Sequence, residues 1–257
     1  MTVRSTVKKF TPDAVIWLYR FIRYYRLKFL TFVPTYYEDE ILTGHGCHFM
    51  GDHHFMRCYN AAVSAGLAVS DKIHWRVHVA CWAAARGATL EGDFVECGVY
   101  KGFLSRIAMD YVGFGKLPKT FYLMDTYEGL SDKCISAGER ENGMKAGGYD
   151  PSYEFVVNTF KDYKNVKVIK GTIPDTLSEV TSDKVAYLSI DMNCVIPEIA
   201  AAEYFWDKLV PGAVIVLDDY GFDRHIAQKL AFDEFAKKQN ISILSLPTGQ
   251  GLIVKPG

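Results

Sequence analysis

The sequence predicts an α/β fold in which seven mostly parallel strands form one sheet and helices cover both of its faces. From residue 92 onward, short apolar runs alternate with helical patterns, which is typical of right-handed crossovers between parallel strands. Only residues 247–250 separate the last two apolar runs, and so short a link cannot make a parallel crossover. The last strand should therefore be antiparallel, which gives a Rossmann-like sheet with a closing hairpin.

The same alternation places each element. We expect strands at residues 93–97, 120–124, 166–169, 186–190, 213–217, 241–246 and 251–254, with helices at 103–112, 153–160, 174–180, 197–209 and 226–238 between most of them. Residues 1–90 are interpreted as a helical N-terminal extension that forms a lid or oligomer contacts, and residues 91–257 as the domain that holds the sheet. Within the extension, Ser70 should cap a helix over residues 71–86, with Gly87 as its stop.

A basic amphipathic helix opens the extension. Thr11, Pro12 and Asp13 form a typical helix start, and apolar residues then recur every three or four positions. Residues 1–33 carry seven Lys and Arg against a single Asp, a net charge of +6. Such a helix can pack on its own domain or on a sister subunit with its arginines in water. It can also lie on an anionic membrane surface or contact a lipid-linked acceptor.

Composition excludes several classes of protein. The 257 residues carry a net charge of −1 and are 49% hydrophobic and 23% charged, which argues against disorder and against a globally basic nucleic-acid binder. The six cysteines form no CxxC pair, and no secretory signal is visible. Basic residues inside the most apolar N-terminal stretch exclude a transmembrane helix there. We therefore expect a soluble, reduced, cytoplasmic protein that binds no nucleic acid.

Residues 44–54 hold four of the seven histidines, together with Cys47 and Asp52. Their spacings match none of the usual zinc patterns. The stretch is therefore interpreted as a polar loop, and the functional alternative is a substrate lid.

The strongest motif is the turn after the first strand, Glu96-x-Gly98-x-x-x-Gly102. Glycines at such a turn allow a ligand to approach the backbone closely, and the helix that follows directs free N–H groups at it. A carboxylate at Glu96 suits the α-amino group of an amino-acid-bearing cofactor, whereas it would repel a pyrophosphate. The alternative is a buried turn in which Glu96 caps the helix.

A second acid, Asp125, ends the second strand. This position is where ribose hydroxyls are held in sheets of this topology. The alternative is a strand-end Asp that caps the next turn. Together, Glu96 and Asp125 favour S-adenosylmethionine, because one carboxylate can receive its amino group and the other its ribose.

Three further carboxylates follow the fourth and fifth strands: Asp191, Asp218 and Asp219. Carboxyl ends of parallel strands face the same crevice, where like charges destabilise one another unless a cation or a proton intervenes. Oxygen-only ligands suit a hard cation such as Mg²⁺, which would lower the pKa of a bound hydroxyl. The alternative is that Asp218 and Asp219 cap the next helix, which would leave Asp191 unexplained.

In combination, these motifs resemble the macrocin/novobiocin-type (TylF-like) sugar O-methyltransferases, a class I methyltransferase family. The resemblance covers about residues 92–256 and rests on segments 92–98, 125–130, 171–177, 211–212, 218–221 and 248–255, with Asp191 between them. It implies Mg²⁺ or a similar cation on Asp191, Asp218 and Asp219. It also implies S-adenosylmethionine bound by Glu96, Gly98, Gly102, Ser105, Asp125 and Thr126, with Gly171 and Asp175 beside the adenine.

The resemblance implies a substrate hydroxyl on a sugar of a glycoside, polysaccharide or nucleotide-sugar, and we also expect a homo-oligomer. The sequence departs from the family at Asn193, where the pattern D-x-D-x-Y has a second Asp that is a candidate general base. Asn193 cannot accept the proton, so Asp191 with the metal, or alternatively His225, is the predicted catalytic group. A metal-dependent catechol or phenol O-methyltransferase, and a non-catalytic cofactor-binding scaffold of a glycan-assembly complex, remain the alternatives.

Overall fold

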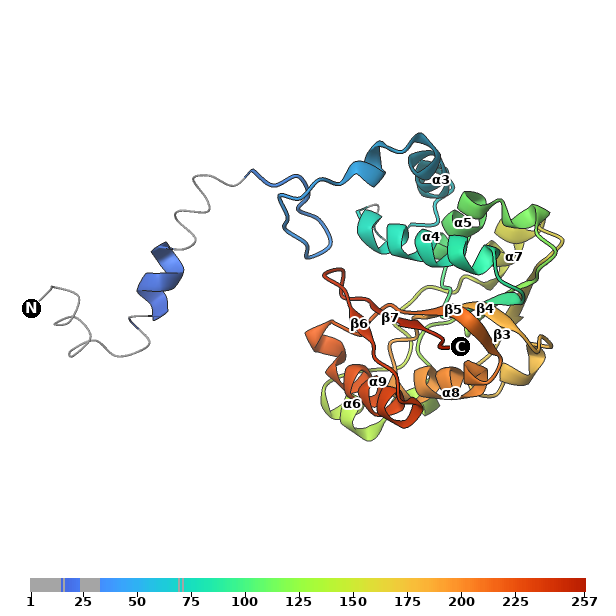
Figure 1. Cartoon of the computed structure of the whole chain (residues 1–257). Coiled ribbons are helices and arrows are strands. Elements are labelled where there is room, and N and C mark those ends of the chain that lie inside the picture. The colour runs from blue at the N-terminus through green and yellow to red at the C-terminus, as the bar shows by residue number, and fades with distance from the viewer. Residues whose placement is uncertain (1–14, 16, 24–32, 69, 71) are drawn as a thin grey trace, which may run out of the picture. The chain divides into compact units, whose positions relative to one another are not determined.

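The computed structural model describes residues 15, 17–23, 33–68, 70 and 72–257. The chain divides into two compact units, residues 1–47 and 48–257. Helices α3 (His53–Ser64) and α4 (His74–Ala88), which the sequence assigns to the N-terminal extension, belong to the same unit as the sheet (Figure 1). In the first unit residues 17–23 are helical, and the predicted helix start at residues 11–13 lies outside the described residues. No described helix is both long and apolar enough to cross a bilayer.

All seven predicted strands are present in one sheet, in the order β3-β2-β1-β4-β5-β7-β6. Strands β1 to β5 pair in parallel, and β7 is antiparallel to both of its neighbours, which confirms the closing hairpin. The strand order reverses between β1 and β4, where a ligand crevice is expected. The strands are β1 (Asp93–Cys97), β2 (Phe121–Asp125), β3 (Val166–Lys170), β4 (Val185–Ile190), β5 (Leu209–Leu217), β6 (Leu244–Ser245) and β7 (Gly251–Val254).

Alternating side chains of the strands build a core on each face of the sheet. On β5, Val214 and Val216 pack with α4, α5 (Phe103–Val112) and α7 (Tyr153–Phe160), whereas Ile215 and Leu217 pack with α8 (Val195–Trp206) and α9 (Ile226–Gln239). The two layers of helices lie on opposite sides of the sheet in Figure 1. Because β4 is buried along its whole length, both of its faces are covered, as expected for a central parallel strand.

The helices differ from the predictions in several places. No helix was predicted where α3 lies, and α4 continues past the predicted stop at Gly87 to Ala88. Helix α4 begins at His74 and has no side-chain cap, so the predicted Ser70 cap is wrong; the Ser70 hydroxyl accepts from Lys72 N instead. Residues 174–180 form only a 3₁₀ turn, Leu177–Glu179, because seven residues are too few to sustain an α-helix without extensive packing. The sequence did not indicate the short helix α6 (Ala137–Glu141). Ser136 and Glu139 form a capping box at its N-terminus.

The histidine-rich stretch is only in part the loop that the sequence predicts, because residues 48–51 form a 3₁₀ helix and α3 begins at His53. Asp52 caps α3 by accepting from His54 N at 2.8 Å, and His54 Nε2 lies 2.9 Å from Tyr111 O. Among residues 15, 17–23, 33–68, 70 and 72–257, no group of histidines converges on a common point that could hold a metal.

Candidate active site

A cavity of about 350 Å³ opens at the carboxyl edge of the parallel strands, beside the reversal between β1 and β4. The ends of β1, β2, β4 and β5 all contribute to its wall, so residues far apart in the sequence meet there. Every acidic residue that the sequence predicts for the site lines this cavity, except Asp175: Glu96, Asp125, Asp191, Asp218 and Asp219.

Glu96 is the buried acid of β1. Its side chain is 2% exposed, and its Oε2 atom has no hydrogen-bond partner among the described residues. Burial raises the pKa of Glu96 to about 8, and the nearby Ser105 hydroxyl counteracts part of this rise. The Ser105 hydroxyl and Glu96 Oε2 do not form a hydrogen bond of ordinary geometry. Because an unpartnered buried carboxylate is unfavourable, this position is suited to receive a cationic group from a ligand.

Gly98 allows the turn after β1 to cross the end of β4. Its φ is 92°, and a Cβ atom built on it would lie 1.7 Å from the Asp191 carbonyl oxygen. The Asp191 backbone N–H also donates to Cys97 O at 2.8 Å. A glycine is therefore required at this position to bring the turn after β1 next to the aspartate cluster.

Asp125 fastens two loops of the site. Its Oδ2 accepts from Val99 N at 2.6 Å and Tyr100 N at 2.8 Å, and its Oδ1 accepts from Tyr127 N at 2.7 Å. The Thr126 hydroxyl lies 3.2 Å from Oδ1 but donates over a shorter 2.6 Å to Gly129 O. Since that hydroxyl has one proton, Oδ1 keeps one acceptor position for a ligand hydroxyl.

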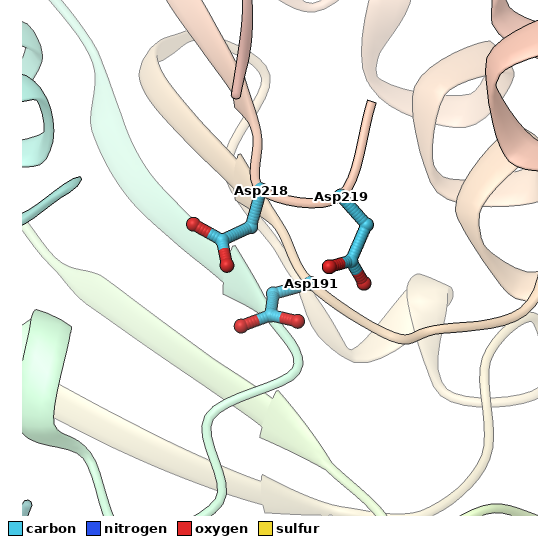
Figure 2. A group of neighbouring side chains, drawn as sticks. All are labelled: Asp191, Asp218 and Asp219. Atoms are coloured by element: carbon cyan, nitrogen blue, oxygen red, sulfur yellow. The ribbon is translucent and has the colours of Figure 1, made fainter. Parts of the chain in front are cut away.

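The aspartates Asp191, Asp218 and Asp219 form the one group of potential metal ligands in the described part of the chain. One oxygen from each lies within 4.8 Å of the others, and Figure 2 shows the three side chains next to one another. Asp218, 2% exposed, is held by Arg76 at 2.6 Å and by the Gln250 amide at 2.9 Å. Arg76 therefore neutralises part of the cluster's charge.

Burial and mutual repulsion change the acidity of this cluster. Burial, followed by the charges of Asp218 and Asp219, raises the pKa of Asp191 well above its ordinary value. Burial and the charge of Asp218 raise the pKa of Asp219 to about 7. Asp219 Oδ2 has no hydrogen-bond partner within the described ranges. Three carboxylates with an orphaned buried oxygen are a donor set that fits a hard divalent cation.

His225 lies behind Asp219 and does not line the cavity. Its Nε2 is 3.9 Å from Asp219 Oδ2, and its Nδ1 is 3.0 Å from the Gln228 amide nitrogen. Burial, assisted by Arg224, lowers the pKa of His225, so the imidazole is neutral at neutral pH. The geometry suits orientation of Asp219 rather than direct contact with an acceptor hydroxyl.

The loop after β4 places Asn193 in the cavity wall with a positive φ of 57°. Its side-chain amide lies 3.3 Å from Asp191 Oδ1. Glu198 at the start of α8 accepts from Met192 N at 3.1 Å, and burial raises the pKa of Glu198 to about 8. A buried carboxyl group therefore fixes the loop that presents Asp191.

The other predicted site residues divide into two groups. Thr126 and Gly171 line the cavity, whereas Gly102, Ser105 and Asp175 do not. Gly102 precedes α5 with a φ of 81°, where a Cβ atom would meet the Phe160 ring at 2.6 Å, and the exposed Asp175 pairs with Lys133.

Sequence reasoning missed Arg76 and Gln250. A signal existed for Gln250, because the antiparallel pairing of β7 with β5 sets Gly251 opposite Leu217 and therefore places residue 250 beside Asp218. No comparable signal existed for Arg76, which comes from a helix more than a hundred residues from Asp218 in the chain.

Comparison with known proteins identifies related sequences. Residues 75–244 match the family model of macrocin-O-methyltransferase (TylF). A curated relative from Streptomyces olivaceus, the 8-demethyl-8-(2,3-dimethoxy-alpha-L-rhamnosyl)-tetracenomycin-C 4'-O-methyltransferase, is 26% identical over 142 residues. That match covers 51% of this chain and 54% of the relative, so the chain spans about half the length of the curated relative.

Two solved structures have a similar fold. The O-methyltransferase NovP superposes with a TM-score of 0.62 and 21% identity over 74% of this chain and 83% of its own. The calicheamicin methyltransferase CalS11 gives a TM-score of 0.55 and 12% identity over 82% of this chain and 98% of its own. At these identities the similarity concerns the fold, and it agrees with the Rossmann-like α/β architecture.

Proposed function

Because the chain belongs to the macrocin-O-methyltransferase (TylF) family, we propose that it transfers a methyl group from S-adenosylmethionine to a sugar hydroxyl, with assistance from a divalent cation. The sugar would belong to a glycoside, a polysaccharide or a nucleotide-sugar. The observation that carries this proposal is that Glu96 and the three aspartates line one cavity. A methyl donor and an acceptor hydroxyl bound in that cavity would be held next to each other, and such positioning can lower a barrier by about 7–11 kcal/mol.

The residues at the ends of β1 and β2 fit the proposed cofactor. Glu96 Oε2, which is buried and unpartnered, would accept from the α-amino group, and a nearby ammonium would lower the pKa of Glu96 and keep it ionised. The remaining acceptor position of Asp125 Oδ1 would take a ribose hydroxyl, with Gly171 beside the adenine. When bound, S-adenosylmethionine supplies an electrophilic methyl group on a positively charged sulfur.

The aspartate cluster fits the proposed cation, which when bound would lower the pKa of the acceptor hydroxyl. Gln250 orients Asp218, and His225 faces Asp219 from the side away from the cavity. We assign His225 as a positioning residue for that reason. Asp191, which lies in the cavity wall at the end of β4, would accept the proton from the hydroxyl as the methyl group is transferred.

A methyl-transfer assay tests this function. Labelled S-adenosylmethionine is incubated with glycosides, nucleotide-sugars and catechols, each with Mg²⁺ or with EDTA. We expect transfer to a sugar acceptor, reduced about a hundredfold or more by EDTA. Asp191→Asn should abolish transfer, whereas Asp183→Asn, at an exposed position outside the cavity, should not. Transfer to catechols alone would establish a phenol O-methyltransferase instead, and equal rates in EDTA would exclude the metal.

Asn193 favours a second candidate, a non-catalytic cofactor-binding scaffold of a glycan-assembly complex, because its amide cannot accept a proton. This candidate predicts that calorimetry detects S-adenosylmethionine binding while no acceptor is methylated. In that case Asn193→Asp should create activity, whereas an active parent enzyme would exclude the scaffold.

A further inference from the structure

Two residues of the cavity wall, Arg224 and Tyr149, are not assigned to the proposed donor or cation. Arg224 belongs to the 3₁₀ turn Asp223–His225 that follows β5, and Tyr149 lies in the loop between α6 and α7. Burial raises the pKa of Asp219 and of Tyr149, and the positive charge of Arg224 counteracts part of each rise. Both side chains are therefore close to the aspartate cluster, on the side where the acceptor hydroxyl has to bind.

The guanidinium of Arg224 has no hydrogen bond or ion pair with another described residue. It lies over the Phe222 ring, 5.0 Å from the ring centroid. Arg76 lies near the same ring, at 5.8 Å, but its guanidinium is bound to Asp218 at 2.6 Å. Stacking on an aromatic ring orients a guanidinium and leaves its N–H groups available, which suits it to bind a carboxylate or a phosphate.

The formal charges of the cavity leave room for one anion. The wall carries five carboxylates and three basic side chains: Glu96, Asp125, Asp191, Asp218 and Asp219 against Arg76, Lys101 and Arg224. With all of them ionised, the wall has two negative charges in excess. S-adenosylmethionine would add one positive charge and a divalent cation two, so the loaded cavity would hold one positive charge in excess. An acceptor with one negative charge would restore neutrality, and such complementarity favours the correct partner.

Tyr149 provides an aromatic surface on the same side of the cavity. Its ring packs against the Tyr100 ring at a centroid distance of 5.1 Å, and the residue is 40% exposed, so a ligand can reach it. Backbone hydrogen bonds of 2.9 and 2.8 Å between Leu130 and Gly147 hold the loop that carries it. The face of such a ring can bury the apolar C–H groups of a sugar.

We propose that the acceptor is an anionic sugar, whose carboxylate or phosphate group binds to Arg224 while its ring packs on Tyr149. The hydroxyl to be methylated would then lie beside the aspartate cluster, within reach of Asp191. This inference rests on the proposed function and adds the charge of the substrate to it. Arg224 would select the charge of the acceptor, and Tyr149 would hold its sugar ring.

Calorimetric binding of acceptor analogues tests the proposal without requiring turnover. The protein is loaded with Mg²⁺ and sinefungin, a donor analogue that keeps a positive charge in place of the sulfonium but has no methyl group to transfer. The probes are methyl glucuronide, glucose 1-phosphate and the neutral methyl glucoside. We expect at least one anionic probe to bind about tenfold or more tightly than the glucoside, and the tighter of the two identifies the preferred group. Equal affinities, or no binding of either anionic probe, would overturn the proposal.

Variants separate the two contacts. Arg224→Gln should weaken binding of the preferred anionic probe about ten- to a hundredfold and leave the glucoside unchanged, whereas Arg224→Lys should retain part of the preference. Tyr149→Ala should weaken all three probes by a similar factor, and Tyr149→Phe, which keeps the ring, should not. The matched control is Lys237→Gln, which removes a positive charge from an exposed position outside the cavity wall and should change nothing. A preference that survives in Arg224→Gln would overturn the proposal.

Two comparisons distinguish this inference from other outcomes. If Arg224 only neutralised the aspartate cluster, Arg224→Gln would change the affinity for Mn²⁺ and for all three probes alike, and the anion site would be wrong. Selective binding of an anionic probe without methyl transfer to any acceptor would support the anion site and reject the proposed transferase. Methyl transfer with equal kcat/KM for neutral and anionic sugars would support the transferase and reject the anion site.

Discussion

The carboxylate of Glu96 gives the most direct test of the cofactor contact, because its Oε2 atom has no partner in the described residues. We expect Glu96→Gln to weaken S-adenosylhomocysteine binding about ten- to a hundredfold, since hydrogen bonds to charged groups contribute about 1.5–3 kcal/mol. The ligand-free variant should be about as stable as the parent at pH 7, because an amide replaces a carboxyl group that burial keeps mostly protonated there. Calorimetry measures the affinity, and thermal unfolding measures the stability.

The matched control is Glu91→Gln, an exposed glutamate that pairs with the exposed Lys184. It should change neither quantity. Unchanged affinity in Glu96→Gln would show that the amino group of the cofactor binds elsewhere.

Arg76 occupies a position that competes with a metal, because its guanidinium lies 2.6 Å from Asp218. We expect Arg76→Gln to tighten Mn²⁺ binding several-fold, as followed by electron paramagnetic resonance. The metal-free variant should lose about 2–3 kcal/mol of unfolding free energy, because a buried carboxylate loses its ion-pair partner. Arg86→Gln, on the same helix but bonded to Gly212 O, should leave Mn²⁺ binding unchanged. Weaker Mn²⁺ binding in Arg76→Gln would show that Arg76 helps to build the cation site.

At the scale of elements, the crossing of the β1 turn over the end of β4 depends on Gly98. Gly98→Ala would place a Cβ atom 1.7 Å from the Asp191 carbonyl oxygen and would strain a φ of 92°. We expect a loss of about 3 kcal/mol or more in unfolding free energy. Gly113→Ala is the matched control, because φ there is also positive, at 64°, but a Cβ atom meets nothing within 4 Å. It should cost only about 1 kcal/mol, as measured by urea unfolding. Equal losses in the two variants would contradict the role of the crossing.

The elements that the sequence predicts correctly are those with a strong local pattern. Apolar runs such as Val185–Ile190 and the short link before β7 fix the strands and the direction of the last one. Helix α6 is different, because it is five residues long and its buried Glu139 bonds to Val195 N on α8. That tertiary contact stabilises a helix too short for a periodic pattern to reveal.

The candidate site shows the same division. Glu96, Asp125 and the three aspartates could be predicted because each follows an apolar run, and parallel strands bring such positions to one edge. Arg76 on α4, which pairs with Asp218, could not be predicted, because helix packing against the sheet decides which side chains reach these carboxylates.

For the whole molecule, the gathering of acids at one edge predicts an unusual pH dependence of stability. The pKa values of Glu96 and Glu198 are raised by burial to about 8, and that of Asp219 to about 7. In the unfolded chain these groups ionise near their ordinary values, so between about pH 7 and 8 the folded state binds more protons. The free energy of unfolding of the ligand-free protein should then fall as pH rises, by about 1 kcal/mol per pH unit for each of Glu96 and Glu198 and by less than half of that for Asp219.

Thermal unfolding between pH 7 and 8 measures this slope, and the midpoint should fall by several degrees in the absence of ligands. The stability that these acids contribute is fully present below their unfolded pKa and is lost as pH rises through the raised values. Glu96→Gln removes one group and should flatten the slope by its share. Mg²⁺ with S-adenosylhomocysteine should flatten it further, since each brings positive charge to a carboxylate that burial otherwise keeps protonated. A midpoint that stays constant or rises from pH 7 to 8 without ligands would mean that these acids ionise with their ordinary pKa values in the folded protein. The ligand-free cavity would then already stabilise their charges and would need no cation.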